Sequence, residues 1–311
     1  MSNVAVIIVS YNTCALLRDC LASLQACTLP LQVLVVDNGS HDGSVAMVRH
    51  TFPHVHLLEP GANVGFAQAN NLGLAWFAQQ PAALPAYVLL LNPDTIVHHG
   101  ALEALVAFLA QHPRVGLVGP RLLNPDGTHQ AAAFRFPTLL MTLLDLFPPG
   151  EVLPGRLYGS WWHGRYPQER GTAPFAIDHP LGACMLVRRA VLEEVGPLNA
   201  DYFMYSEEVE WCWRIRQAGW AIWQVPDARV THIGGAATSQ LRHSMFSALW
   251  QSRARFAAQR GPAWRIATHH ALVQAGMLRL SLKSWRAYRQ GRLSRNELRA
   301  HLWAYGEAGK G

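Results

Sequence analysis

Three short apolar runs restrict the folds available to this chain. They are VAVIIVS (Val4–Ser10), QVLVVD (Gln32–Asp37) and YVLLL (Tyr87–Leu91). None of them alternates apolar with polar residues, which is typical of strands in a parallel sheet that is covered on both faces. Between the first two runs, Asn12–Ala26 places leucines at helical spacing. This pattern predicts a βαβ unit with a crossover helix.

The alternation of strand and helix continues along the chain. We expect helices at Ser44–His50, Phe66–Gln79, Ala101–Gln111, Ala190–Val195 and Glu208–Gln217, and strands at His54–Glu59, Cys184–Arg188 and Ala221–Gln224. The order predicts a doubly wound α/β sheet whose ligand site lies beyond the carboxyl ends of the strands. Each strand end is indeed polar: SYN, DNGS, EPGANVG and NPDT.

Two parts of the chain depart from this pattern. Residues 131–175 are rich in Pro, Gly and aromatic residues, so we expect a long functional or mobile loop. After Gly235 the chain looks helical, over His243–Gln259 and Ala271–Tyr288. We therefore expect a nucleotide-binding domain over 1–240 and a helical extension over 241–311.

Composition excludes several classes of protein. The chain has 311 residues, of which 50% are hydrophobic and 15% charged, so it is globular. Its five cysteines form no CxxC pair, and their odd number argues against a disulfide framework and for a reducing compartment. The amino terminus lacks the features of a signal peptide, and no window is long and apolar enough for a spanning helix. We expect a cytoplasmic protein, soluble or peripheral at the inner face of the plasma membrane.

The positive charge is concentrated in the extension. Residues 241–311 carry eleven Arg and two Lys against two Glu, a net charge of +11, whereas the rest of the chain carries −5. Nucleic-acid binding is disfavoured because no recognisable module is present. The mixture of Arg and Trp with Leu and Phe suits an interfacial helix pair on anionic lipid. The alternative is an Arg-rich helical appendage that packs on the main domain or on a second subunit.

Two of the polar strand ends suggest a nucleotide site. Asp37 closes its strand inside VVDNGSHDGS, where the glycines permit tight turns. The alternative is an ordinary turn rich in Asx residues. Asn63, Gly65 and Asn70 lie in a loop that leads into a helix, which suits a close approach of backbone to phosphate. That loop is neither a Walker A sequence nor a GxGxxG motif.

Asp94 follows the most apolar of the strands, and Pro93 rigidifies the turn before it. A carboxylate at this position can meet a hard cation, since Mg²⁺ typically takes one or two carboxylates together with substrate phosphates. The alternative is that Asp94 caps a helix over Thr95–Ala110.

Two further features carry titratable side chains. Glu207 and Glu208 begin a predicted helix between two aromatic segments, where crowding could raise a carboxylate pKa and suit it to general base work. The alternative is a solvated acidic face that complements the helix dipole. His232 ends a short strand in ARVTHIGG, and a lone histidine is more often structural than a ligand.

Seven segments, taken in order, resemble the motifs of glycosyltransferase family 2, the inverting nucleotide-sugar transferases of the GT-A fold. They cover about three quarters of the chain, from Val4 to Gly235: VAVIIVSYN, VVDNGSHDGS, ANVGFAQANNLG, LLLNPDT, HPLGACMLVRR, YFMYSEEVEWCWRIRQAGW and VPDARVTHIGG. The NPDT form and the closing HIGG are most similar to the branch that includes rhamnosyltransferases and galactofuranosyltransferases. The resemblance implies a GT-A (Rossmann-like) mixed, mainly parallel sheet flanked by helices, with the helical extension appended.

The resemblance also implies roles for single residues. Ser10, Tyr11 and Asn12 would line the nucleotide pocket, and Asp37 would hydrogen-bond the base or ribose. Asp94 matches the last acid of the family's DXD motif, which ligates a divalent cation (Mg²⁺ or Mn²⁺). The remaining matches are Asn92, which replaces the first acid of that motif; His232, which would complete the metal site; and the pair Glu207 and Glu208, of which the second matches the usual base.

The function implied is transfer of a sugar, most readily rhamnose from dTDP-rhamnose, to a glycan or polyprenyl-diphosphate-linked acceptor in cell-envelope polysaccharide synthesis. One alternative is a different donor such as UDP-galactofuranose. Another, prompted by Asn92 and by Glu in place of Asp at 208, is a catalytically impaired nucleotide-sugar binding protein. A Rossmann-type dehydrogenase is disfavoured because no GxGxxG follows the first strand. The sequence does not indicate an oligomeric state.

Overall fold

The computed structural model of this protein describes residues 4–80, 85–148, 160–234 and 242–310. These residues form two compact units. The first contains the described parts of 1–136, 165–203 and 207–237, and the second those of 137–164, 204–206 and 238–311. The boundary expected at 240 falls outside the described residues. The second unit differs from the expected extension because it also includes residues 137–148, 160–164 and 204–206.

A mixed, mostly parallel sheet forms the first unit, as predicted. Its strand order is β3-β2-β1-β4-β11-β6-β12-β5, and only β11 and β5 run antiparallel to their neighbours. The strands are β1 (Val4–Ser10), β2 (Leu31–Asp37), β3 (His56–Leu58), β4 (Tyr87–Leu91), β5 (Thr95–Val97), β6 (Val115–Leu123), β11 (Cys184–Arg188) and β12 (Ala221–His232). Short strands β7 (His129–Gln130) and β9 (Phe175–Ala176) pair with β6 and β12, and β8 (Ala133–Phe134) pairs with β10 (His179–Pro180).

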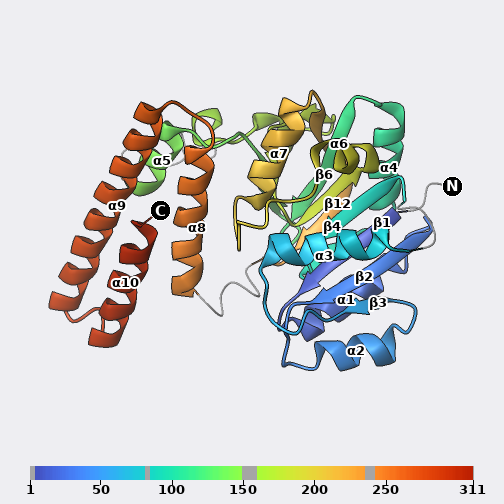
Figure 1. Ribbon diagram of the computed structural model, residues 1–311, viewed down its shortest axis with the longest axis horizontal. Coiled ribbons are helices and arrows are strands. Elements are labelled where there is room, and N and C mark those ends of the chain that lie inside the picture. Colours follow the sequence, from blue (N-terminus) through green and yellow to red (C-terminus); the bar gives the residue numbers. More distant parts are fainter. Residues whose placement is uncertain (1–3, 81–84, 149–159, 235–241, 311) are drawn as a thin grey trace. The chain divides into compact units, whose positions relative to one another are not determined.

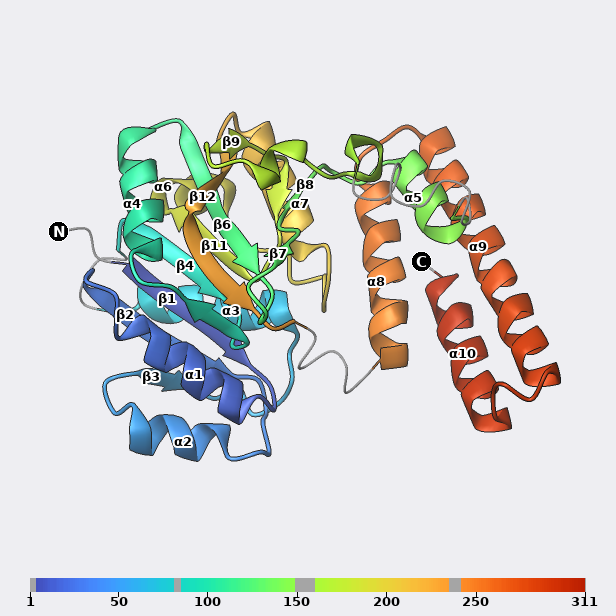
Figure 2. The same ribbon diagram turned by 180° about the vertical axis from the view of Figure 1, so that it is seen from behind.

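Helices cover both faces of the sheet, and this explains why its strands are apolar without alternation. Figure 1 shows α3 in front of the sheet, and Figure 2 shows α1 in front when the same unit is turned around. Each face has its own cluster of buried side chains. The helices on one face are α1 (Cys14–Leu24), α2 (Ser44–Thr51) and α4 (Ala101–Gln111); those on the other are α3 (Phe66–Ala78), α6 (Arg189–Val195) and α7 (Glu207–Gln217).

The structure decides one alternative and corrects one expectation near the middle of the chain. Helix α4 has the expected bounds, Ala101–Gln111, and residues 95–97 form β5 and pair with β12, so the alternative of a helix over Thr95–Ala110 is excluded. Asp94 is therefore not a helix cap. The loop expected over 131–175 contains regular structure in its described parts: β8, α5 (Leu139–Leu146), and the 3₁₀ helices η1 (Trp161–His163) and η2 (Pro167–Arg170).

The parallel strands bring their carboxyl ends to one edge. Ser10 at the end of β1 lies beside Asp37 at the end of β2 in the strand register. The ends of β4, β6 and β12 point the same way because β11, between β4 and β6, is antiparallel to both. Side chains far apart in the sequence therefore meet where these strands stop.

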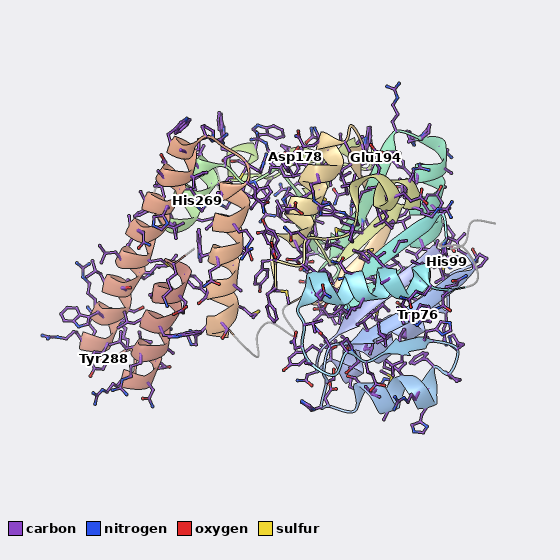
Figure 3. All side chains as sticks on the ribbon, in the orientation of Figure 1. Trp76, His99, Asp178, Glu194, His269 and Tyr288 are labelled. Atoms are coloured by element: carbon purple, nitrogen blue, oxygen red, sulfur yellow. The ribbon has the colours of Figure 1, made fainter. Side chains whose placement is uncertain are left out.

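The second unit consists of helices, and the prediction of a helical extension at the carboxyl-terminal end is confirmed. They are α5, α8 (Arg242–Ala258), α9 (Ala263–Arg289) and α10 (Arg295–Ala308). A small apolar core holds them together: Leu146, Trp250, Val273, Met277 and Ala308. Gly276 of α9 allows α5 to approach closely, since a Cβ there would lie 2.7 Å from Leu146. Figure 3 labels His269 and Tyr288, which mark the two halves of α9.

Candidate active site at the carboxyl ends of the strands

Asp37 presents one free acceptor at the end of β2. The side chain is 4% exposed, and its Oδ2 accepts a hydrogen bond from the backbone N of Ser40 at 2.9 Å. The buried Oδ1 has no hydrogen-bond partner among the described residues. A buried acceptor left unpaired costs about 1–3 kcal/mol. Asp37 Oδ1 is therefore suited to accept a hydrogen bond from a ligand.

The loops that follow β1 and β2 are locked together beside Asp37. The backbone N of Asn12 donates to Ser40 Oγ at 2.9 Å, and the backbone N of His41 donates to Asn12 Oδ1 at 2.8 Å. Asn12 adopts a left-handed backbone with φ of 50°, which Asn tolerates better than most residues. Its amide oxygen therefore has a structural role, as well as lying next to the predicted pocket.

Ser10 and Tyr11 differ in how far a ligand can reach them. The Ser10 side chain is fully buried, and its hydroxyl lies 3.0 Å from Thr13 Oγ1. Tyr11, the next residue, is half-buried and follows the strand end. Of the two side chains, that of Tyr11 is accessible to a ligand at this edge.

The loop before α3 is held by a network of amides. Asn38 Nδ2 donates to Asn63 Oδ1 at 2.9 Å, and Asn63 Oδ1 also accepts from the backbone N of Gly65 at 3.1 Å. Asn38 Oδ1 in turn accepts from the backbone N of Val64 at 2.9 Å. The Asn63 oxygen thus shapes the loop, while the residue itself is exposed.

Gly65 is required at its position for steric reasons. Its φ is +85°, and a Cβ there would lie 2.6 Å from the carbonyl oxygen of Phe203. Asn70, one turn into α3, is 1% exposed, and its Nδ2 donates to the Phe66 carbonyl at 2.9 Å. The Asn70 side chain is therefore buried and hydrogen-bonded within its own helix.

Asp94 and His232 come together at the ends of β4 and β12. The His232 Nε2 lies 3.4 Å from Asp94 Oδ1, and the two side chains are 10% and 9% exposed. The backbone holds the pair, since the N of Ile233 donates to the Asp94 carbonyl at 2.9 Å. The family resemblance implied that these two residues, 138 positions apart in the sequence, belong to one metal site. The structure brings their side chains into contact.

Asn92 lies two residues before Asp94 and is half-buried. Its backbone N donates to the Ala183 carbonyl at 2.8 Å, and its carbonyl accepts from Thr95 Oγ1 at 2.7 Å. Within the described residues, no group of three or more His, Cys, Asp or Glu side chains could hold a metal ion. Asp94 and His232 supply one oxygen and one nitrogen, so phosphate oxygens or water must complete any cation's coordination.

Glu207, the first residue of α7, is a buried acid. It is 5% exposed, and its Oε2 has no hydrogen-bond partner within the described parts of the chain. Burial, together with the neighbouring Glu208 carboxyl, raises the pKa of Glu207 well above its ordinary value. The residue is consequently neutral over a range in which an exposed glutamate is ionised. Tyr205 and Ser206, directly before it, both adopt left-handed backbones, with φ of 68° and 64°.

Glu208 is the more accessible acid of the pair. It is half-buried, and its side chain lies beside Gly182, where an added Cβ would contact its Cγ at 3.5 Å. The next residue, Ala183, accepts the hydrogen bond from Asn92. Glu208 therefore lies beside the segment Gly182–Ala183, which is hydrogen-bonded to the residue two positions before Asp94. The third acid of the motif, Glu210, is engaged with Arg214 at 2.8 Å.

Sequence reasoning missed Gln130 of β7. Its Oε1 lies 2.8 Å from His232 Nδ1. The one sequence sign was the turn NPDGT (residues 124–128), which predicts a hairpin and so places residue 130 next to the end of β6.

Comparisons with known proteins identify the family of this chain. The model of the family "Glycosyl transferase family 2" matches residues 5–196. An N-acetylglucosaminyl-diphospho-decaprenol L-rhamnosyltransferase of Mycobacterium tuberculosis is 32% identical over 270 residues, which cover 83% of this chain and 85% of the relative. A dTDP-rhamnosyl transferase of Shigella flexneri is 22% identical, with 75% of this chain and 70% of the relative covered.

A solved structure shares the fold. The mannosyltransferase of Pyrobaculum calidifontis, in complex with GDP-mannose and Mn²⁺, superposes with a TM-score of 0.57 at 19% identity. The match covers 99% of this chain and 86% of that one.

Proposed function

This chain belongs to glycosyl transferase family 2, and we propose that it transfers rhamnose from dTDP-rhamnose to a polyprenyl-diphosphate-linked saccharide, with inversion at the anomeric carbon. The choice of sugar and acceptor rests on the relatives from M. tuberculosis and S. flexneri. The observation that carries the site is the buried contact between Asp94 and His232 at the strand ends. The reaction belongs to cell-envelope polysaccharide synthesis.

In this proposal the nucleobase of dTDP-rhamnose lies against Asp37. The unpaired Asp37 Oδ1 requires a hydrogen-bond donor, and thymine and uracil both carry an N–H at N3. Tyr11 lines the same pocket, and Asn12, Ser10, Asn63 and Gly65 shape its walls. Asn70 is buried and hydrogen-bonded within its own helix. We therefore propose that it stabilises α3 rather than contacting the nucleotide-sugar.

Asp94 and His232 fit a divalent cation that also binds the diphosphate of the donor. Two side chains that each offer a lone pair lie 3.4 Å apart with little exposure, a separation that a shared cation can bridge. When bound, the cation neutralises charge on the departing diphosphate. A nitrogen ligand favours Mn²⁺ over Mg²⁺, because Mg²⁺ takes oxygen ligands. Asn92 offers an amide oxygen in place of the usual first acid.

Glu208 is the general base in this proposal. Its carboxylate removes the proton of the acceptor hydroxyl while that oxygen bonds to the anomeric carbon. The bond from this carbon to the phosphate oxygen breaks on the opposite face, so the configuration inverts and the nucleotide diphosphate leaves. Glu207 remains protonated beside it, since burial raises its pKa. A neutral neighbour leaves the charge of the pair on Glu208.

A ligand screen tests the donor assignment. We expect dTDP and dTDP-rhamnose to raise the melting temperature in the presence of Mn²⁺, since a ligand that binds only the folded state stabilises it by mass action. UDP-galactofuranose is the alternative donor, and stabilisation by UDP nucleotides alone would favour it. Tight donor binding without transfer to any acceptor would favour the impaired binding protein instead.

We further propose that the second unit attaches the enzyme to anionic membrane lipid through α9. This helix has 27 residues, five of them basic and none acidic. Among the helices that the structure describes, none has the length and hydropathy needed to cross a bilayer. Any contact with lipid through α9 would therefore be interfacial.

The face of α9 opposite its core is apolar and exposed. The core side contributes His269, Val273, Gly276, Met277 and Ser284. Exposed apolar residues recur at helical spacing on the other side: Trp264, Ala271, Ala275, Leu278, Leu282 and Trp285. We call these six residues the outer stripe. Trp264 and Leu278 are 64% and 63% exposed, and they belong to a row of apolar residues rather than lying singly on the surface.

Cations lie next to the outer stripe in the last turns of α9. The Arg289 guanidinium lies 5.3 Å from the centre of the Trp285 ring, and Lys283 and Arg286 are exposed in the same stretch. This arrangement matches an interfacial helix, whose apolar face enters the headgroup region while basic residues meet anionic lipid. Each basic residue near such a surface contributes about 1 kcal/mol.

Vesicle sedimentation tests the membrane proposal. We expect wild-type protein to bind phosphatidylglycerol vesicles more than phosphatidylcholine vesicles, and to release them as salt rises. The triple variant Leu278→Ser/Leu282→Ser/Trp285→Ser should lose binding. The matched control, Leu140→Ser/Leu143→Ser on the exposed face of α5, should retain it. Absence of binding by the wild type would refute the proposal, and a dimer that the triple variant abolishes would identify a second copy as the occupant.

A further inference from the structure

Gln130 connects the imidazole of His232 to a chain of hydrogen bonds that ends at the protein surface. Gln130 Oε1 lies 2.8 Å from His232 Nδ1. Its Nε2 donates to Asn124 Oδ1 at 3.0 Å and to the His232 carbonyl at 3.1 Å. The amide nitrogen therefore has two acceptors on one side, and the amide oxygen faces the ring.

The chain continues through the turn between β6 and β7. Asn124 Nδ2 donates to Thr128 Oγ1 at 2.9 Å, and Thr128 Oγ1 donates to Asp126 Oδ1 at 2.6 Å. Hydrogen bonds from the Thr128 hydroxyl and backbone hold the pKa of Asp126 below its ordinary value. The ionised carboxylate of Asp126 can only accept.

One acceptor at the end sets the direction of every bond before it. Because Asp126 accepts from Thr128, the Thr128 oxygen is left to accept from the Asn124 amide nitrogen. The Asn124 oxygen then accepts from Gln130 Nε2, and Gln130 Oε1 accepts from His232 Nδ1. We call the series Gln130, Asn124, Thr128 and Asp126 the relay.

We propose that Gln130 is a positioning residue for the metal site, because the relay keeps the proton of His232 on Nδ1. This inference rests on the proposed function, in which Asp94 and His232 hold the cation. With Nδ1 protonated, the neutral ring has its lone pair on Nε2, which lies 3.4 Å from Asp94 Oδ1. Ring orientation and ligand atom are thus set before a cation binds.

The opposite orientation of the Gln130 amide would prevent a cation from binding at His232 Nε2. An amide N–H directed at Nδ1 needs a lone pair on Nδ1, so the proton of the neutral ring would move to Nε2. That proton would occupy the position needed by the cation. Partners of this kind commonly contribute 10-fold to 100-fold to metal affinity.

The anchor of the relay is a rigid turn. The backbone N of Asn124 donates to the Thr128 carbonyl at 2.8 Å, and the N of Gly127 donates to the Asn124 carbonyl at 2.9 Å. Gly127 has φ of +80°, a conformation that favours glycine. Because these bonds fix the turn without the Gln130 side chain, substitutions at 130 can change the relay and leave the hairpin formed.

Two substitutions separate the hydrogen bond from the shape of the side chain. Gln130→Met retains length and removes the acceptor, whereas Gln130→Glu retains an acceptor for the Nδ1 proton. In metal-free protein, ¹⁵N NMR of labelled histidine, with His232 assigned by its loss in His232→Ala, should show the Nδ1–H tautomer in the wild type and in Gln130→Glu. The Gln130→Met variant should gain the Nε2–H tautomer.

Mn²⁺ binding, measured by electron paramagnetic resonance with dTDP present, gives the second readout. We expect Gln130→Met to weaken Mn²⁺ binding by about 10-fold or more. Gln130→Glu should lose less, because it keeps the acceptor for Nδ1 although it places an oxygen against Asn124 Oδ1 and the His232 carbonyl. In a His232→Ala background, Gln130→Met should have no further effect, because the two residues act as one unit. An equal loss in that background would indicate a merely structural role and overturn the proposal.

The outcomes distinguish this inference from the function on which it rests. An Nε2–H tautomer in a wild-type protein that binds Mn²⁺ overturns the relay and leaves the metal site intact. An Nδ1–H tautomer in a wild-type protein that binds no Mn²⁺ overturns the metal site, and with it the role of Gln130.

Discussion

Glu207 and Glu208 are neighbours in the sequence and differ in environment. Helix α7 directs Glu207 into the interior and leaves Glu208 half-buried beside Gly182. The Glu207 carboxyl is therefore neutral, and the Glu208 carboxylate is accessible to the acceptor substrate. The same separation of two acids by burial assigns acid and base roles in other enzymes. The pair identified from sequence could not be resolved by sequence, because burial depends on what packs around α7.

The buried acid predicts a dependence of stability on pH. Folded protein keeps the proton of Glu207 at pH values where the unfolded chain has lost it, so stability falls as pH rises above the ordinary value of 4.5. Glu207→Gln removes this effect. We expect its free energy of unfolding, relative to the wild type, to rise between about pH 5 and about pH 8, by at most about 1.4 kcal/mol per pH unit.

Urea denaturation at several pH values measures this difference. The exposed Glu193 of α6 provides the matched control, and Glu193→Gln should stay within about 0.5 kcal/mol of the wild type throughout. A Glu207→Gln difference that stays constant with pH would show that Glu207 is ionised in the folded protein.

At the scale of the element, strands and helices with strong apolar patterns followed from the sequence. The runs at β1, β2 and β4 have the bounds expected within one residue. β6 was missed because two glycines and a proline interrupt its apolar run, VGLVGPRLL. α10 was missed although its start carries a capping box, Ser294 with Glu297, which was readable in the sequence.

Contacts between elements explain what the sequence could not indicate. β12 runs for twelve residues and pairs with β6, β5 and β9, and it is this length that carries His232 to Asp94. The relay likewise depends on the pairing of β7 with β6. Such pairings join distant segments, and local propensity does not specify them.

Close packing of the loop before α3 gives a prediction at the same scale. Gly65→Ala meets both the Phe203 carbonyl and a backbone conformation (φ 85°, ψ 170°) that is nearly restricted to glycine, whereas Gly43→Ala meets the milder strain of an αL backbone (φ 87°, ψ 5°) with no atom within 4 Å. We expect Gly43→Ala to cost about 1–2 kcal/mol of unfolding free energy and Gly65→Ala roughly 2 kcal/mol more. Equal losses in chemical denaturation would mean that the loop yields to the added methyl group.

At the scale of the whole molecule, chemistry and charge are assigned to different parts of the chain. The first unit carries the candidate catalytic residues, and residues 241–311 carry the net charge of +11. The sequence predicted this asymmetry by counting. It could not predict that α5 joins the carboxyl-terminal helices, because this contact depends on packing between Leu146 and Gly276.

The central claim is that Glu208 is the base of a glycosyl transfer from dTDP-rhamnose. Its most direct test is the rate of rhamnose transfer to a polyprenyl-diphosphate-linked N-acetylglucosamine analogue in the presence of Mn²⁺, measured alongside donor affinity. The account predicts that Glu208→Gln keeps wild-type donor affinity and loses about 10²-fold to 10⁴-fold in kcat. A Glu208→Gln variant that transfers rhamnose at the wild-type rate would contradict it.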